Sequence, residues 1–148
     1  SSEISKVTEW ALSPVIKIGD FPNTVVDVHI SILQANASTR CAGINAAAMA
    51  LAHAGVPMTE MVSAVSVGKI DDKIAVDITK EEEDYEDGEG ATDIHLAFTS
   101  NSNRITLLQL DGKTDAKKLK EAIKAGQEAC KKIYEIQKQA LKEAQINL

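Results

Sequence analysis

Residues 24–33 carry the pattern that most constrains how this chain folds. Apolar and polar side chains alternate along the segment, with Val26, Val28, Ile30 and Ile32 at every second position and Asp27, His29 and Ser31 between them. Successive side chains of a β-strand point to opposite faces, so the alternation predicts a strand from Thr24 to Leu33 with one buried face. Few segments upstream could pair with it. We therefore expect its partners to come from an N-terminal part outside the sequence or from another chain.

Three segments show the features of helices. Residues 3–12 place apolar side chains at helical spacing before Pro14, and residues 40–54 form an alanine-rich apolar stretch that stops at Gly55. The first predicts a short amphipathic helix, and the second predicts a buried helix with a glycine cap. A long third helix follows Gly112, where Thr114 provides a cap and an apolar stripe recurs at steps of four and three: Leu119, Ile123, Gly126, Cys130 and Ile133. We expect this stripe to lie across the sheet, with a coiled coil as the alternative.

Two further pairs of apolar runs predict β-hairpins. Residues 61–67 and 74–78 flank a turn longer than the tightest type, which contains Asp71, Asp72 and Lys73, and residues 94–98 and 105–110 flank an Asn-Ser-Asn turn. The order helix, strand, helix, two hairpins and helix predicts an α+β sandwich with helices layered on a mixed β-sheet. No linker or repeat divides the 148 residues. Residues 1–148 are therefore expected to be part of a single domain, with no second domain.

Composition narrows the classes of function. The formal net charge of −6 argues against a whole surface that binds nucleic acid, so any such site must be local or shared with a partner. No apolar run approaches the roughly 20 residues that span a bilayer, and no segment resembles a secretory signal. A cytoplasmic protein without membrane contact is the expectation. Cys41 and Cys130 lie far apart without other ligands nearby, which indicates buried, reduced thiols rather than a disulfide or a zinc site.

The junction between the predicted strand and the buried helix is a candidate anion site. Ser38, Thr39 and Arg40 stand where the helix begins. A helix N-terminus presents free backbone N–H groups and the positive end of the helix dipole, and hydroxyl and guanidinium groups add donors suited to phosphate. The alternative is that Ser38 or Thr39 only caps the helix while Arg40 is solvated.

An acidic loop is the second candidate. Residues 86–93 read Glu-Asp-Gly-Glu-Gly-Ala-Thr-Asp, which places Asp87 and Asp93 six residues apart and sets Asp93 at the start of a strand. One carboxylate of such a pair could bind a magnesium ion while the other acts as general acid toward a leaving oxygen. The alternative is an ordinary solvated acidic surface, as expected for the neighbouring residues 81–84. The three histidines lack companions at ligand spacing, so metal binding by them is not expected.

These two segments and several others resemble the RNase PH family, and most closely the catalytic RNase PH-type subunit of the archaeal exosome. The resemblance covers most of the chain, and its most specific stretches are Phe21-Pro-Asn-Thr24, Leu33-Gln-Ala35, Ser38-Thr-Arg40, Ala42-Gly-Ile44, Ala54-Gly-Val-Pro-Met58, Gly68-Lys69 and Leu107-Leu-Gln-Leu-Asp-Gly112. It implies an RNase PH-like (ribosomal protein S5 domain 2-like) fold, of which this chain is the C-terminal portion. The N-terminal strands and the RNA-binding arginines of the family are expected to lie outside it.

The resemblance also implies an activity: phosphorolytic 3′-to-5′ shortening of RNA, which releases nucleoside diphosphates and runs backwards as RNA tailing. Inorganic phosphate is then a co-substrate held by Ser38, Thr39 and Arg40. The family pattern Asp-x-x-Gly-x-x-Asp falls on Asp87, Gly90 and Asp93 as catalytic residues, with magnesium at Asp87 and Asp93. Asp84 is a rival to Asp87 as the first carboxylate.

The implied partners are the single-stranded 3′ end of RNA, a second RNase PH-like subunit in an alternating hexameric ring, and RNA-binding cap subunits. Two other readings stay open at this point. One is a noncatalytic ring subunit that binds RNA or partners without chemistry. The other is an RNase PH-like homohexamer that matures tRNA 3′ ends.

Overall fold

A four-stranded antiparallel sheet forms the centre of the computed structural model, which describes residues 2–146. The strands are β1 (Val62–Ile70), β2 (Lys73–Val76), β3 (Ala91–Thr99) and β4 (Ile105–Asp111), in the order β2-β1-β3-β4. The two predicted hairpins are thus confirmed, and β1 and β3 pair with each other along their whole length. The register of these pairs fixes which side chains are neighbours on each face of the sheet.

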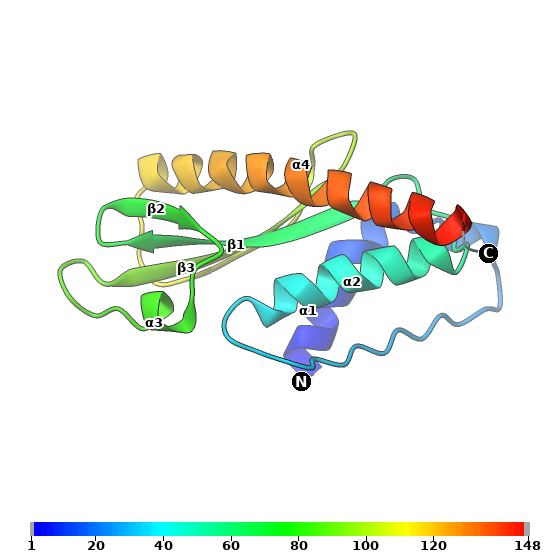
Figure 1. The fold of residues 1–148 in the computed structure, drawn as a ribbon, viewed down its shortest axis with the longest axis horizontal. Helices are drawn as coiled ribbons and strands as arrows, with labels where there is room; N and C mark the ends of the chain where they lie inside the picture. Colours follow the sequence, from blue (N-terminus) through cyan, green and yellow to red (C-terminus); the bar gives the residue numbers. More distant parts are fainter. Residues whose placement is uncertain (1, 147–148) are drawn as a thin grey trace.

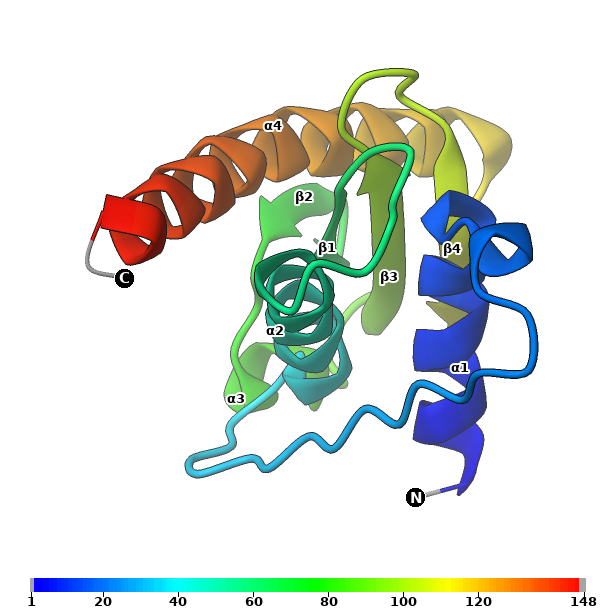
Figure 2. The same cartoon turned by 90° about the vertical axis from the view of Figure 1, so that its right-hand side faces the viewer.

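Helices cover both faces of this sheet, as Figures 1 and 2 show. The long helix α4 (Ala116–Ile146) packs on one face, over Val67, Ile94 and Leu96. On the other face, α1 (Ser2–Leu12) and α2 (Thr39–His53) pack over Ala64 and other apolar side chains of the sheet. The α+β sandwich is therefore confirmed. The expected mixed sheet is antiparallel throughout the described residues.

The helix α2 ends as the sequence predicts. Gly55 has a φ of 79°, and its N–H donates to the carbonyl of Ala52, while the N–H of Val56 donates to that of Leu51. This pair of bonds is the Schellman arrangement, and glycine fits its left-handed position without steric cost. Because this end is closed by its own backbone, α2 presents its free N–H groups only at its start, next to residues 36–38.

The predicted strand at Thr24–Leu33 is wrong. The segment is extended, but it pairs with no other part of residues 2–146, and its alternating apolar side chains stay between 39 and 47% exposed. Figure 2 shows it as a coil that runs outside the sheet toward the start of α2. Ile30 rests against α2, where a Cβ added at Gly43 would lie 3.6 Å from its side chain. A strand exists only where a neighbour accepts and donates its backbone hydrogen bonds.

Two local predictions also need correction. The turn between β1 and β2 is of the tightest kind, since Ile70 pairs with Lys73 and only Asp71 and Asp72 lie between them. At the start of α4, the carboxylate of Asp115 accepts from the N–H of Lys118 at 2.8 Å, so Asp115 rather than Thr114 provides the cap.

The apolar stripe of α4 faces the sheet and not a second helix. A Cβ added at Gly126 would lie 2.5 Å from the Leu96 side chain, so a glycine is needed for the close approach of helix and strand. Gln137, which lies four residues after Ile133 on the same stripe, is buried. It accepts a hydrogen bond from the Ser63 hydroxyl and donates one to the carbonyl of Val62. The apolar stripe is therefore covered by the sheet and is not available for a coiled coil.

Both cysteines are free and buried, as predicted. Burial raises the pKa of each thiol to about 12, so the thiolate forms of Cys41 and Cys130 are rare near neutral pH. Within residues 2–146, no helix is long and apolar enough to cross a membrane.

Candidate functional site

Polar side chains from three strands gather beneath the start of α2. Ser66 on β1, Asp93 and His95 on β3 and Gln109 on β4 all point to the α2 face, because Ser66 pairs with His95 and His95 with Gln109 in the sheet. Arg40, in the first turn of α2, lies over them. We call these five residues the Asp93 cluster.

Asp93 is held at both of its carboxylate oxygens. The hydroxyl of Ser66 donates to Oδ1 at 2.8 Å, and Nε2 of His95 lies 3.1 Å from Oδ2. The side chains of His95 and Asp93 are only 8 and 12% exposed. Burial lowers the pKa of His95, although the nearby carboxylate of Asp93 acts in the opposite direction. Burial of the pair therefore favours the neutral form of the imidazole.

Arg40 reaches across the sheet from α2. Its Nη1 donates to Oε1 of Gln109 at 2.6 Å, and Nε2 of Gln109 donates to a carboxylate oxygen of Glu3 on α1 at 3.3 Å. The guanidinium charge lowers the pKa of His95, which places Arg40 close to the Asp93–His95 pair. The structure thus brings together Arg40 and Asp93, two of the residues that the sequence singled out.

Ser38 has an unusual conformation for a residue that begins a helix. Its φ is 60°, in the left-handed region, and its carbonyl accepts from the N–H groups of Cys41 and Ala42. Its hydroxyl makes no capping bond, and it is buried without a hydrogen-bond partner among residues 2–146. A buried hydroxyl without a partner costs free energy, about 1–3 kcal/mol. Capping therefore does not explain Ser38, and an acceptor at this position would satisfy its hydroxyl.

A cavity of about 700 Å³ opens between α2 and α4 beside this cluster. Both helices and the sheet contribute side chains to its wall. These include Ser38 just before α2, Cys41 and Asn45 on α2, Ser66 on β1, Asp77 just after β2, and Lys132 on α4. A space of this size falls in the range of sites for small molecules. Ser38 and Ser66 connect it with the Asp93 cluster.

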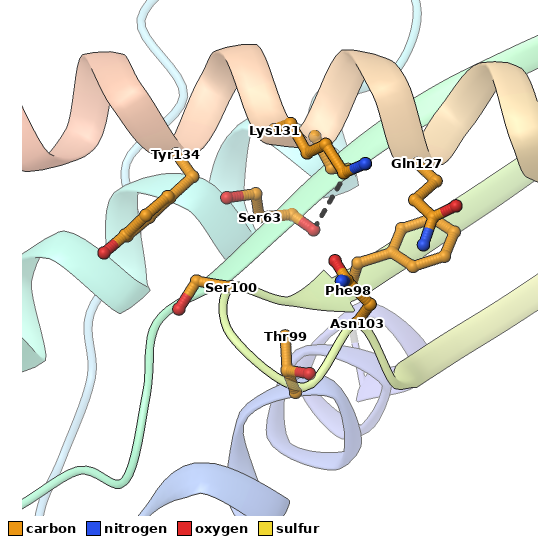
Figure 3. Close-up of a pocket in the computed structure, with 9 residues that line it drawn as sticks. Ser63, Phe98, Thr99, Ser100, Asn103, Gln127, Lys131 and Tyr134 are labelled. Carbon is orange, nitrogen blue, oxygen red and sulfur yellow. Dashed lines mark hydrogen bonds between the residues drawn. The ribbon is translucent and has the colours of Figure 1, made fainter.

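A second space, drawn in Figure 3, lies under α4 and has a different character. It is lined by Ser63, Phe98 and Tyr134 among others, and its volume is about 10 Å³, room for about one water molecule. The dashed line marks the hydrogen bond from the Cys130 thiol to the Ser63 carbonyl at 3.3 Å. This space is a packing gap and not a ligand site.

The acidic loop lies at the end of the sheet where β3 begins. Asp87 is exposed, and its carbonyl accepts from the N–H of Gly90, which in turn accepts from Asp71 in the β1–β2 turn. Asp93 follows three residues after Gly90, about 10 Å along the strand. No recorded contact within residues 2–146 joins Asp87 to Asp93 or Arg40. Asp84, the rival first carboxylate, pairs with Lys80 at 2.8 Å.

A magnesium ion shared by Asp87 and Asp93 stays a prediction. Such an ion requires both carboxylates within a few ångströms of one point. In the structure Asp87 lies in the loop before β3, and both oxygens of Asp93 have side-chain partners. Within residues 2–146, no group of three or more His, Cys, Asp or Glu side chains could hold a metal ion.

Sequence reasoning assigned no role to four residues that the structure places at or near the site. Ser66 and Gln109 join the cluster through cross-strand neighbours, which depend on the register of the hairpins. His95 has a signal in the sequence, because residues 93 and 95 share one strand face. Glu83 in α3 (Lys80–Glu83) is the one residue of the acidic stretch 81–89 whose charge is recorded as raising the pKa of His95. Glu83 is therefore within electrostatic reach of the cluster.

Two family models match the chain. The model described as 3′ exoribonuclease family, domain 1, matches residues 1–57, and the model described as 3′ exoribonuclease family, domain 2, matches residues 60–129. Together they cover most of the sequence. The first contains the start of α2, and the second contains the strands of the Asp93 cluster.

Similar proteins support the same family assignment. The chain is 46% identical over 148 residues to the exosome complex component Rrp41 of Thermococcus gammatolerans, covering 100% of this chain and 58% of that protein. It is 45% identical over 139 residues to the Rrp41 of Nitrosopumilus maritimus, covering 94% of this chain and 55% of the relative. For Methanopyrus kandleri Rrp41 the identity is 43%, with 97% and 58% covered. The chain thus spans somewhat more than half the length of these relatives.

A solved structure supports the fold. The crystal structure of rice (Oryza sativa) Rrp46 superimposes with a TM-score of 0.83 at 23% identity, covering 95% of this chain and 64% of that one. At this identity the likeness concerns the fold and does not extend to the chemistry.

Proposed function

Because the chain belongs to the RNase PH family of 3′ exoribonucleases, we propose that it is a phosphate-dependent 3′-to-5′ exoribonuclease subunit of an exosome-type ring. The observation that carries this proposal is the placement of Arg40 and the unpartnered Ser38 hydroxyl at the start of α2, over the carboxylate of Asp93. The proposed phosphate site and the carboxylate proposed for proton transfer are therefore adjacent.

In the proposed reaction, inorganic phosphate binds at the start of α2. The N–H groups of the first helical turn, the Ser38 hydroxyl and the Arg40 guanidinium donate to its oxygens. A phosphate oxygen attacks the phosphorus of the last phosphodiester, the bond to the 3′ oxygen of the preceding ribose breaks, and a nucleoside diphosphate leaves. The leaving 3′ oxygen takes up the proton that the attacking hydrogen phosphate gives up, and Asp93 relays this proton. Positioning and charge stabilisation supply most of the acceleration. No step is assigned to a metal.

We propose that other chains or segments provide the contacts to RNA. The net charge is −6, and Arg104, the only arginine besides Arg40, lies in the β3–β4 loop, where it pairs with Glu60. A second RNase PH-like subunit alternating with this one in a hexameric ring, and RNA-binding cap subunits, would supply basic groups for a single-stranded 3′ end. A cytoplasmic location remains part of the proposal.

The identity of the product tests the proposed reaction. The native assembly is incubated with a single-stranded RNA, with and without inorganic phosphate, and the released nucleotides are separated. Nucleoside diphosphates that appear only with phosphate are expected, and Asp93→Asn should abolish their release while leaving thermal unfolding nearly unchanged. Glu135→Gln, an exposed carboxylate of α4, is the matched control. Release of nucleoside monophosphates, or activity indifferent to phosphate, would overturn the proposal.

The position of Asp87 supports one competing function. If two carboxylates are required and the second stays outside the cluster, the chain acts as a noncatalytic ring subunit that binds RNA or partners. The same assay decides between them, because a noncatalytic subunit releases no nucleotide whether or not Asp93 is present. The homohexamer that matures tRNA 3′ ends differs in assembly and is separated by mass.

A further inference from the structure

Both oxygens of the Asp93 carboxylate are engaged by side chains that the proposed reaction does not use. Ser66 donates to Oδ1 from the neighbouring strand β1, and His95 approaches Oδ2 from two positions along the same strand. We propose that Ser66 and His95 are positioning residues, which together fix the Asp93 carboxylate in one orientation beneath the start of α2. This inference rests on the proposed function, since it concerns the residue given the proton-transfer role there.

The two contacts come from different directions, and together they define the plane of the carboxylate. Ser66 stands diagonally across the strand pair, because Asp93 itself faces Gly68. Gly68 has no side chain of its own, and the Ile78 side chain fills the space where its Cβ would be. Thus the site next to Asp93 is closed by packing on that side. A carboxylate with one fixed oxygen can still rotate, whereas one with two fixed oxygens cannot.

The setting of His95 restricts its own movement. Its side chain is 8% exposed, and it lies between its cross-strand neighbours Ser66 and Gln109. Gln109 in turn is held by Arg40 at 2.6 Å. The ring therefore lies between two polar neighbours and contacts Asp93 through Nε2. An ordinary core histidine would satisfy its nitrogens on backbone groups, but the recorded partner of Nε2 is the carboxylate itself.

A positioning role predicts a specific kinetic pattern. Misplacing a reacting group by about 1 Å costs up to about a hundredfold in rate, while phosphate binding at the start of α2 depends on other residues. Replacing His95 or Ser66 should therefore lower kcat without changing the KM for phosphate. A variant that restores an N–H donor at the same reach should recover most of the loss.

The experiment uses the native assembly with full-length protein and measures kcat and the phosphate KM for His95→Leu, His95→Gln and Ser66→Ala. We expect His95→Leu to lower kcat about ten- to a hundredfold with the phosphate KM within about twofold of wild type. His95→Gln should recover most of the activity, and Ser66→Ala should show a smaller fall in kcat of the same kind. His53→Leu, an exposed histidine at the end of α2, is the matched control and should have no effect.

Three outcomes overturn the inference: wild-type kcat in both His95→Leu and Ser66→Ala, equal loss in His95→Leu and His95→Gln, or a loss that appears mainly in the phosphate KM. If His95→Leu does not assemble, His95→Gln and Ser66→Ala still decide, because both keep the polarity or the volume of the site. Asp93→Asn separates the two levels of the argument. Full turnover in Asp93→Asn removes the proposed function of the site, whereas its loss alongside normal His95 and Ser66 variants removes only the positioning role.

Discussion

Arg40 is one of only two arginines in the chain, and the two have different surroundings. Arg40 bridges α2 and β4 through Gln109, whereas Arg104 is 69% exposed and lies 3.7 Å from Glu60. A guanidinium at a helix start is suited to hold phosphate through parallel N–H donors, while an exposed guanidinium in an ion pair contributes little. The two residues therefore provide a matched comparison.

Arg40→Ala should raise the KM for phosphate at least about tenfold, because a charge-assisted hydrogen bond contributes about 1.5–3 kcal/mol. Arg104→Ala should leave it unchanged. The measurement is the rate of nucleoside diphosphate release against phosphate concentration in the native assembly. Equal phosphate dependence in the two variants would show that Arg40 serves packing alone.

Glu60 shows how a single carboxylate links a loop to the sheet. It accepts from the backbone N–H groups of Asn101 and Ser102 at 2.8 and 2.9 Å and from the Ser102 hydroxyl at 2.7 Å. Burial alone would raise its pKa, but these hydrogen bonds from Ser102 and Asn101 prevail and lower the pKa from 4.5 to about 2. The ionised carboxylate is thus favoured in the folded protein, and the β3–β4 loop is held by it.

The pH dependence of stability follows from this shift. Because the folded pKa lies below the unfolded one, Glu60 contributes stability above about pH 4.5 and loses it as the pH falls toward about 2. Thermal unfolding followed from pH 6 to pH 2 should show a smaller drop in Tm for Glu60→Gln than for the wild type. The variant should also be less stable than the wild type at pH 6. Parallel Tm curves would mean that the loop bonds do not depend on this charge.

At the scale of elements, the segment 24–33 shows what a sequence pattern can and cannot predict. The alternation correctly indicates extended backbone, and Ile30 does pack on α2 at Gly43. Pairing, however, is a property of two segments, and no partner lies beside this one within residues 2–146. For the same reason the sequence predicted Asp93 and Arg40 but not Ser66 or Gln109, whose places depend on strand register. The end of α2 depends on local backbone chemistry, so its glycine cap at Gly55 could be predicted from the sequence.

Unpaired backbone should exchange its amide hydrogens quickly. In this chain alone, amides of residues 25–33 should exchange within seconds at neutral pH, while those of β1 and β3 in the sheet centre should be protected for far longer. Hydrogen exchange read by mass spectrometry checks this. In the native assembly or in a longer form of the protein, protection of every second amide in 25–33 would show that a strand has joined it. Strong protection in this chain alone would contradict the unpaired conformation.

At the scale of the whole molecule, the chain spans somewhat more than half the length of the relatives that it matches. The start of α2 and the segment 24–33 lie on the same side of the molecule, as Figures 1 and 2 show. Whatever pairs with that segment would therefore also approach the Asp93 cluster. Completion of the fold and completion of the site are expected to occur together.

Native mass spectrometry tests this expectation. The assembly purified under gentle conditions should have a mass that corresponds to a ring of this subunit alternating with a second type of RNase PH-like subunit. Dissociating the ring should abolish RNA shortening even though each subunit remains folded, as judged by circular dichroism. A homohexamer would favour the alternative of tRNA 3′-end maturation, and an active monomer would contradict the need for a partner.

The two faces of the sheet differ in what they contribute. The centre of the α4 face is an apolar layer of Val65, Val67, Ile94, Leu96 and Phe98, whereas the opposite face carries the polar row of Ser66, Asp93, His95 and Gln109. Buried polar side chains of this kind are often replaced by apolar ones without loss of stability. A duplicated form of this subunit could thus lose the polar side chains of the Asp93 cluster, keep the fold, and still pack against neighbouring subunits. Relatives can therefore keep the fold and lose the reaction independently, because the two depend on opposite faces of the same four strands.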